Sequence, residues 1–286
     1  MRLVFIFGFI CLSFLSVAQQ RLVQWVNPFI GTGGHGHTSP GATMPFGMVQ
    51  LSPDNGTQGW DWCSGYNFVD TLIQGFSHTH LSGTGIGDLC DISVLPMVDK
   101  VATPERIRSR FSHKQETATP GYYAVQLKDF DVWAELTTTI RCGMHRYTFP
   151  ESKNAIIQFD LGFAINWDAA TQCNFKKIND TTFVGYRFST GWAKNQKVFF
   201  AVQVNKPVKN LILFSNKNKV DSTTATAKNV KACLQFETKK GEKILMKVGL
   251  SSADEEGALA SLTEIDNWDF DKVKQDAENI WERELR

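Results

Sequence analysis

Two short segments combine aromatic, acidic and histidine side chains that could together support chemistry on a small ligand. The run GWDWCSGY spans residues 59–66, and the run GFSHTHLSGTG spans residues 75–85. An indole offers an apolar ring face to the C–H face of a pyranose and an N–H group to a hydroxyl. A small-ligand site needs such a plate together with a few polar groups. With a preceding glycine-rich loop, these segments give the candidate binding residues Gly33, Gly34, Trp60, Asp61, Cys63, His78 and His80.

Trp60 and Asp61 each have a structural alternative. Trp60 could pack in a core, and Asp61 could cap backbone amides in a turn. We expect Asp61 to position sugar hydroxyls rather than to transfer protons. In an extended segment, Trp60 and Trp62 would share one face while Asp61 and Cys63 share the other. A turn is therefore required if these side chains are to meet a single ligand.

The histidines raise the question of a metal. His78 and His80 are two residues apart and would project together from a strand, and His35 and His37 repeat that spacing. Imidazole suits zinc, copper or nickel, whereas calcium prefers oxygen ligands. We predict no metal ligand among these residues. Hydrogen bonds to sugar hydroxyls or within loops are the expected roles, and structural histidines with satisfied hydrogen bonds are the alternative.

The motif-rich zone resembles the opening of glycoside hydrolase family 92. The resemblance is carried by four runs in order: VNPFIGTGGHGH at residues 26–37, PGATMPFGMVQLSPD at residues 40–54, and the two runs already described. Later stretches agree in the same order, namely FSH at 111–113, PGYY at 120–123, ELT at 135–137, HRY at 145–147 and KVGLSS at 247–252. The resemblance covers about residues 24–286.

This resemblance implies a mainly β fold: a large antiparallel β-sandwich of the galactose-mutarotase-like supersandwich type, followed by C-terminal linker helices. Members of the family are calcium-dependent, inverting exo-α-mannosidases with a second, helical-barrel domain that carries the general acid and base. We therefore expect the N-terminal, carbohydrate-binding half of an exported exo-α-mannosidase acting on mannose-rich glycans, inactive by itself. Calcium is expected mainly from the absent domain. The alternatives are a stand-alone carbohydrate-binding β-sandwich module without hydrolase activity and a purely structural shell domain.

The acidic residues of the motif-rich zone agree with that expectation. Inverting hydrolysis needs two carboxyl groups roughly 6.5–9.5 Å apart with a water between them. The spacing of these acids singles out no such pair, and we predict no catalytic residue in this chain. The acids concerned are Asp54, Asp61, Asp70, Asp88 and Asp91.

Strand patterns dominate the middle of the chain. Apolar residues alternate with polar ones in the segments 123–128, 198–204, 230–236 and 244–250. Alternation with a period of two predicts half-buried strands. Many such strands without intervening helices favour a sandwich. We expect one β-sandwich domain over residues 19–250.

The last segment predicts helices that act as a linker over residues 251–286. Ser251 or Ser252 could cap a first helix through Leu262, and Asp266 or Asn267 could cap a second. Residues 273, 277, 280, 281 and 285 of the second helix form one apolar face. We expect this face to meet the absent helical domain, or else to fold back on the sandwich of the same chain.

Composition bounds the cellular context. Residues 1–18 read as a signal peptide, with Arg2 before an apolar segment and small residues at 16–18. This predicts export to the periplasm or beyond the cell, with a lipid anchor at Cys11 as the less favoured alternative. No later stretch approaches 18 uninterrupted apolar residues, so no membrane span is expected.

Charge and cysteine content exclude some partners. The chain has 30 basic and 29 acidic residues, and Arg2 is the only charged residue before position 19, so the expected mature chain is neutral. It lacks the basic stripe that nucleic acid requires, so the expected partners are a mannose-containing glycan and the absent helical domain. The five later cysteines form no CxxC pair; they could be buried hydrophobes or form one or two disulfides.

Overall fold

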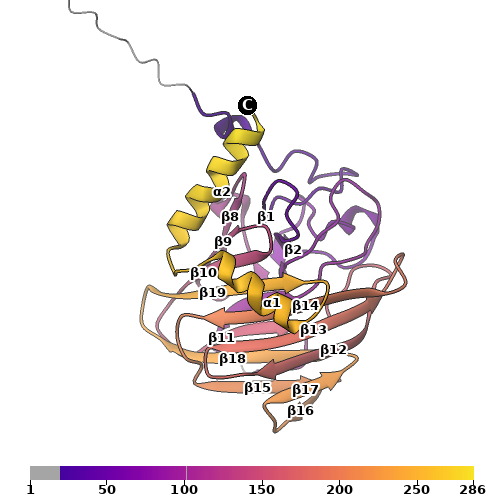
Figure 1. Ribbon diagram of the computed structural model, residues 1–286, viewed down its shortest axis with the longest axis vertical. Helices are drawn as coiled ribbons and strands as arrows, with labels where there is room; N and C mark the ends of the chain where they lie inside the picture. The colour runs from indigo at the N-terminus through magenta and orange to yellow at the C-terminus, as the bar shows by residue number, and fades with distance from the viewer. Residues whose placement is uncertain (1–19, 101) are drawn as a thin grey trace, which may run out of the picture.

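The alternating segments form long antiparallel strands in a computed structural model that describes residues 20–100 and 102–286 (Figure 1). The predicted signal peptide at 1–18 lies outside the described residues. One sheet runs in the order β1 (Ala42–Thr43), β2 (Gln50–Asp54), β4 (Gly75–Ser77), β5 (Ser93–Val98), β11 (Ser152–Asp160), β18 (Val230–Thr238), β15 (Asn210–Ser215) and β16 (Asn218–Val220). Its neighbouring strands are antiparallel throughout.

The second sheet is longer. It runs in the order β17 (Thr224–Ala227), β12 (Ala169–Lys177), β13 (Thr182–Thr190), β14 (Gln196–Val204), β19 (Glu242–Ser251), β10 (Cys142–Phe149), β9 (Val132–Thr138), β8 (Tyr122–Leu127) and β7 (Glu116–Thr119). A small ribbon pairs β3 (Leu72–Ile73) with β6 (Ser109–Arg110). The remaining short elements are the 3-10 turns η1 (Val23–Trp25), η2 (Trp60–Trp62), η3 (His113–Gln115) and η4 (Leu262–Glu264).

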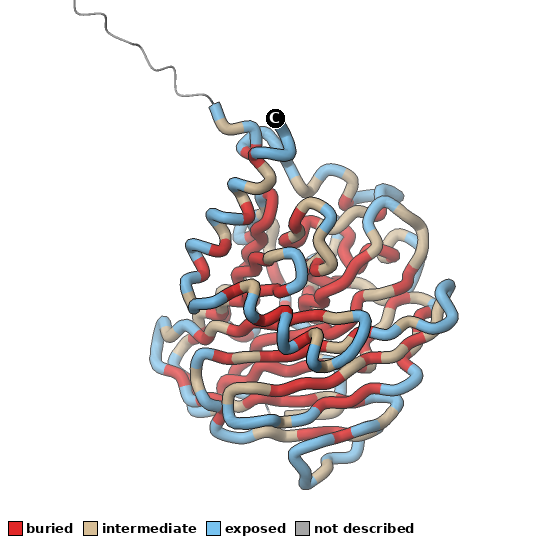
Figure 2. Tube along the Cα trace, in the orientation of Figure 1, coloured by how far each residue is buried: buried red, intermediate tan, exposed pale blue. Residues whose placement is uncertain are grey.

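The main core lies between the two sheets. Phe159 of β11 meets Phe175 of β12 with ring centroids 5.4 Å apart, and Phe200 of β14 lies 5.9 Å from Phe175. Inward-facing positions such as these are the apolar residues that alternate with polar ones along the strands. Figure 2 shows the buried positions running along the strands and the exposed ones gathered at the turns. The predicted large antiparallel sandwich is confirmed.

Two helices cover the outer face of the second sheet. Helix α1 (Glu255–Ser261) lies on β13, β14 and β19, and α2 (Phe270–Glu284) lies beside β8, β9 and β10 (Figure 1). This second layer explains why both faces of β8 are buried. The predicted caps are wrong by a few residues: Asp254 accepts from the Gly257 amide at 2.7 Å, and Asp269 accepts from the Lys272 amide at 3.0 Å.

Part of the apolar face of α2 packs on the chain itself. Phe270, Val273 and Ala277 are buried, and Nε1 of Trp281 donates to the Thr43 carbonyl at 2.7 Å. Gly121 permits this contact, because a Cβ there would lie 2.8 Å from that of Ala277. The first turns of this face therefore fold back on the sandwich, which was the alternative, whereas Leu285 at its end is 38% exposed. Contact of the remainder with a further domain stays a prediction. Within the described residues, no helix is long and apolar enough to cross a membrane.

The cysteines behave as small hydrophobes. In the described part of the chain all are free and buried, namely Cys63, Cys90, Cys142, Cys173 and Cys233. Burial raises the pKa of the Cys142 thiol to about 12. Of the two alternatives that the sequence left open, buried hydrophobes are confirmed over disulfides.

Two histidines form a hydrogen-bonded link across the core. His78 follows β4 in one sheet, His145 lies in β10 of the other, and their Nε2 atoms are 2.9 Å apart. Nδ1 of His78 faces the Ile92 carbonyl at 2.7 Å, which can only accept. Nε2 of neutral His78 must therefore accept from His145, whose Nδ1 accepts from the Tyr147 hydroxyl at 2.7 Å. An added proton would place donor against donor, and burial lowers the pKa of His78 to about 4.

This link predicts acid-sensitive stability. The folded pKa of His78 lies below the unfolded value of about 6.5, so the unfolded state binds more protons in between. The contribution of neutral His78 to the free energy of unfolding should be fully present above pH 6.5 and should fall as the pH drops toward 4. By pH 5 the loss from this one group should be roughly 2 kcal/mol. Urea unfolding at pH 7.5 and pH 5 measures it.

Two substitutions make that measurement specific. His78→Gln should reduce the difference between the two pH values, because the neutral amide cannot take up a proton. His35→Gln is the matched control, because this side chain is 71% exposed, and it should leave the difference intact. Equal pH dependence in wild type and His78→Gln would contradict the assignment.

A buried arginine provides a second link. Arg187 of β13 is fully buried and ion-paired with Asp91 at 2.5 Å and with Asp168. It also donates to the carbonyls of Leu161 at 3.1 Å and Phe163 at 3.0 Å. Burial alone would lower the pKa of the guanidinium, but the two carboxylates raise it. Arg187 thus joins β13 to the loop before β5 and to the loop before β12.

Replacement of this arginine should be among the most destabilising single changes. Arg187→Met leaves two buried carboxylates and two carbonyls without their donor, at a cost of about 3–5 kcal/mol in the free energy of unfolding. Arg110→Met, which breaks an exposed pair with Asp129, should leave the urea midpoint nearly unchanged. The expectation fails if the two variants unfold at the same urea concentration.

Candidate functional site

Trp60 and Asp61 lie on a turn rather than on a strand. They form η2 with Trp62, and the preceding Gly59 has a φ of 104°, which favours glycine. The Gly59 amide donates to Oδ1 of Asn166 at 2.9 Å, which fixes the turn against a distant loop. Trp60 is 55% exposed, whereas Trp62 is half-buried. The turn that the sequence argument required is therefore present.

Two histidines surround the Trp60 indole. The His37 ring meets it edge-on with centroids 4.4 Å apart, and the His35 ring lies 5.1 Å away. Nδ1 of His35 contacts Oδ1 of Asp61 at 2.5 Å. Nε2 of buried His37 is 3.9 Å from the same oxygen and has no hydrogen-bond partner among the described residues. The four side chains form one surface cluster, which we call the Trp60 cluster.

The predicted glycines border this cluster. Gly33 and Gly34 are exposed and lead directly into His35. Gly34 has a φ of 56°, and a Cβ there would meet nothing within 4 Å. Gly33 would place one 3.8 Å from the Cβ of Phe68. The loop is therefore open to solvent on the side of the Trp60 cluster.

Three predicted site residues lie beneath the surface instead. Cys63 is fully buried and accepts a hydrogen bond from Asn166 at 3.4 Å, and burial raises the pKa of its thiol. His78 belongs to the cross-sheet link, and His80 is buried beside Asp54. In this chain none of the three reaches the surface that holds Trp60, because their side chains point into the core.

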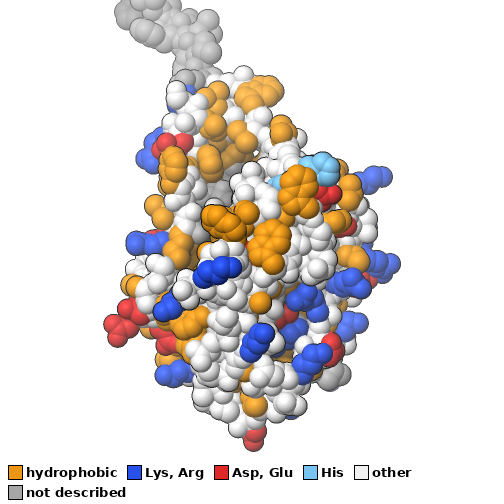
Figure 3. Space-filling model, turned by 90° about the vertical axis from the view of Figure 1, so that its right-hand side faces the viewer, with side chains coloured by type: hydrophobic (Ala, Val, Ile, Leu, Met, Phe, Trp, Pro, Cys, Tyr) orange, Lys and Arg blue, Asp and Glu red, His pale blue; other side chains and the backbone are white. Residues whose placement is uncertain are grey.

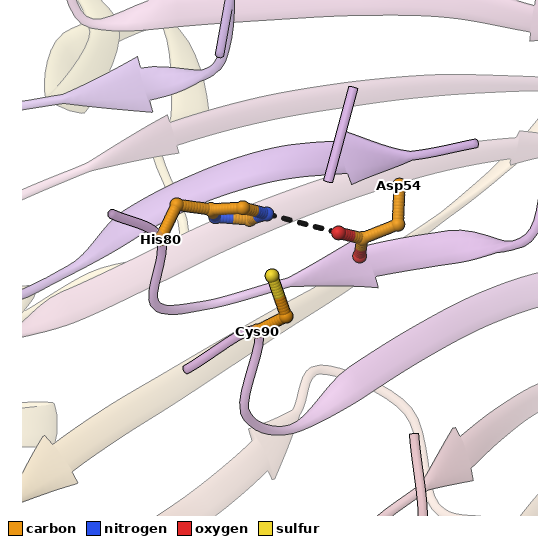
Figure 4. Close-up of side chains that lie close together, drawn as sticks. All are labelled: Asp54, His80 and Cys90. Atoms are coloured by element: carbon orange, nitrogen blue, oxygen red, sulfur yellow. Dashed lines mark hydrogen bonds and ion pairs between the residues drawn. The ribbon is translucent and has the colours of Figure 1, made fainter. Parts of the chain in front are cut away.

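His80 is part of a mixed donor cluster with Asp54 and Cys90 (Figure 4). One donor atom from each lies within 4.8 Å of the others. Nε2 of His80 is 3.0 Å from Oδ1 of Asp54, and its Nδ1 faces the Gln50 carbonyl at 2.7 Å. A nitrogen, a sulfur and a carboxylate oxygen suit a zinc-like ion and do not suit calcium, which prefers oxygen alone.

A second set of surface residues was missed by the sequence analysis. Asp88 is buried and accepts from Nε1 of Trp167 at 3.1 Å and from the amides of Trp192 and Ala193 at 2.9 and 2.8 Å. Nε2 of Gln196 adds a contact at 3.2 Å. Asp88 lies 79 to 108 residues before these partners, so no local spacing could reveal the arrangement. The only sequence signal was tryptophan in loops between predicted strands.

Three exposed tryptophans, Trp60, Trp167 and Trp192, lie near the loop that carries Asp88. Trp167 is 49% exposed and Trp192 is 73% exposed, and the loop that carries Asp88 also contacts Trp60. Figure 3 shows one side of the molecule, on which hydrophobic side chains gather beside a histidine with lysine and arginine side chains around them. The face offers flat apolar surfaces bordered by polar groups, which can bind a ligand that is partly apolar and partly hydroxylated.

Comparison with known proteins places the chain in a family. The family description "Glycosyl hydrolase family 92 N-terminal domain" matches residues 25–251. The structure of the family 92 α-mannosidase BT3965 from Bacteroides thetaiotaomicron with mannoimidazole is 38% identical, with a TM-score of 0.90 over 93% of this chain and 37% of that one. The inverting mannosidase BT2199 of the same organism is 24% identical, with a TM-score of 0.78 over 92% of this chain and 36% of that one, and shares the fold.

A secreted glycosidase of Arthroderma benhamiae, itself uncharacterized, is 27% identical over 92% of this chain and 38% of its own length. The chain thus spans less than two fifths of each relative. Since the family description covers most of the sequence and the sandwich aligns with its solved members, this chain belongs to glycoside hydrolase family 92, as its N-terminal domain.

Proposed function

We propose that the chain is the carbohydrate-binding N-terminal half of an exported, calcium-dependent exo-α-mannosidase that acts on mannose-rich glycans. The observation that carries this proposal is the Trp60 cluster, an exposed indole bordered by His35, His37 and Asp61. The α-mannosidase bound to mannoimidazole, 38% identical to this chain, supports a mannose-type ligand. The secreted relative supports export.

The cluster is suited to bind one pyranose. The exposed face of Trp60 would receive the apolar face of the sugar. The Asp61 carboxylate, whose side chain is 32% exposed, would meet its hydroxyls, and the exposed His35 ring lies beside it. Gly33 and Gly34 would let the backbone approach the ligand, since they carry no side chain. Cys63, His78 and His80 would support this surface from below.

The carboxylates of this zone do not have the environment of a general acid. Asp88 is committed to a set of hydrogen bonds, Asp91 to Arg187, and Asp54 to His80 and the Ser77 amide. Asp61 contacts His35 and is one third exposed, whereas a general acid is usually found in an apolar pocket. We therefore propose that acid, base and calcium come mainly from a further domain. The Asp54, His80 and Cys90 cluster does not fit calcium.

An apolar loop supports contact with such a domain. Phe46 is fully exposed at a φ of 58°, and the amides beside it at 48 and 49 donate to the carbonyl of Ile140, which is also exposed. Exposed apolar side chains of this kind mark interaction surfaces when they are contiguous. The rival proposal is a stand-alone carbohydrate-binding module. It gains from α2, because part of the apolar face of this helix packs on the chain itself.

The first test concerns catalysis by the chain alone. The purified chain should release no measurable mannose from α-mannosides, with or without calcium, because it lacks a suitable acid and base pair. Release is measured by coupled detection of free mannose, with a family 92 α-mannosidase as the positive control. Robust turnover that is lost in Asp61→Asn would show that the chain carries its own catalytic machinery.

The second test concerns Trp60 in a protein that joins this chain to a catalytic domain. Trp60→Ala removes a contact made in both ground and transition states, so KM should rise more than kcat falls. The expected loss in kcat/KM corresponds to about 1–3 kcal/mol. Trp25→Ala, a similarly exposed indole elsewhere, is the control. Unchanged kcat/KM in folded Trp60→Ala protein would contradict the site.

A further inference from the structure

We propose that Trp167 and Trp192 extend the Trp60 cluster into an elongated platform for a chain of several pyranose units. The inference rests on the proposed function, because Trp60 supplies the first position of the platform. It goes beyond that function by adding binding positions for sugars farther along the glycan. The ligand class is an oligosaccharide rather than a single mannose.

One loop contacts all three tryptophan residues. A Cβ at Gly85 would lie 2.2 Å from Nε1 of Trp60, so the loop backbone touches that indole. Three residues later, Asp88 accepts from the ring of Trp167 and from the backbone of Trp192. Three residues of extended chain span at most roughly 10 Å. The backbone positions that contact Trp60 and Trp167 are therefore close enough for one short oligosaccharide to reach both side chains.

Trp167 and Trp192 are each fixed by a hydrogen bond to Asp88, while much of each side chain stays accessible to solvent. Nε1 of Trp167 is bound by buried Asp88, yet about half of its surface is accessible to solvent. Trp192 is 73% exposed although its own amide is bound. Large exposed aromatic rings lower the solubility of a protein, so their presence on the surface usually indicates a binding role. Ring faces presented to solvent in this way are suited to stack on pyranose units.

The platform is rigid before any ligand arrives. Asp168, next to Trp167, is ion-paired with buried Arg187. Gln196 connects Asp88 with Asp168 at 3.2 and 3.3 Å, which ties the loops of Trp167 and Trp192 together. Because these loops are fixed by buried polar groups, binding would order few side chains.

The surroundings favour sugar over a protein partner. The indoles alternate with polar groups, since Asn166 precedes Trp167 and Lys194 folds onto the Gly191 carbonyl at 3.0 Å. The core of a protein interface is instead depleted in charge and continuous in apolar surface. Flat rings interleaved with polar groups match a ligand that has apolar faces and hydroxyl edges.

The experiment compares a short and a long ligand on the purified 286-residue chain by isothermal titration calorimetry. The probes are methyl α-mannopyranoside and a linear α-linked mannotetraose. The tetraose should bind about tenfold more tightly, equivalent to about 1.4 kcal/mol. Trp192→Ala and Trp167→Ala should each reduce that gain and leave the affinity for the methyl glycoside unchanged. Trp25→Ala, an exposed indole outside the platform, should keep the gain.

Further variants separate this inference from the proposed function. Trp167→Phe keeps a ring face but loses the N–H to Asp88, so retained tetraose binding in this variant would support stacking. If the tetraose binds through Trp192 while the methyl glycoside does not bind, the platform stands and the single-sugar site at Trp60 fails. Preference for a β-linked glucose oligosaccharide would keep the platform and contradict the assignment to mannose.

Three outcomes overturn the platform. The first is equal affinity for the short and the long ligand, or no binding of either at millimolar concentration. The second is a gain that survives in both Trp167→Ala and Trp192→Ala. The third is self-association of the wild-type chain that Trp192→Ala abolishes without any change in sugar binding, as sedimentation would show. That last result would assign the face to a protein contact.

Discussion

The arrangement of the exposed face depends on one buried ion cluster. Arg187 sits inside the sandwich and binds Asp91, Asp168 and the carbonyls of Leu161 and Phe163. A buried cation of this kind is tolerated only where carboxylates and further acceptors surround it. Its partners lie on loops that connect strands, not on the strands themselves. The loops before β5 and β12 are therefore fixed from within, and the side chains they carry outward inherit that rigidity.

Burial separates residues that look alike in the sequence. His35 and His37 have the same spacing as His78 and His80, yet the first pair borders an exposed indole and the second lies in the core. The difference arises because β4 ends just before His78 and continues into paired backbone at His80, whereas the glycine-rich loop pairs with no strand. The core histidines here connect strands and sheets, whereas His35 and His37 pack around the exposed Trp60 indole.

The sequence was sufficient for the architecture and only partly for the site. Alternation in segments such as 230–236 predicts β18 well, because period-two burial depends on local pattern. The motif runs likewise locate Trp60 and Asp61. The packing of α2 on the sandwich was only the alternative, because it depends on Gly121 and Thr43, far away in the chain. Asp88 was read only as an unpaired acid, since its four hydrogen-bond donors come from residues 167 to 196.

Three glycines allow the loops around the exposed tryptophans to pack closely against their neighbours. Gly85, Gly87 and Gly191 press against Trp60, Asn166 and Asp88, and a Cβ at any of them would come within 3 Å of its neighbour. Real Cβ contacts are not that short, so larger residues would push the indole, the amide or the carboxylate aside. The buried carboxylates orient the loops, and the glycines let those loops meet. The contacts of Trp60 and Trp167 with the 85–88 loop follow from both, because Gly85 allows the close approach and Asp88 binds the Trp167 indole.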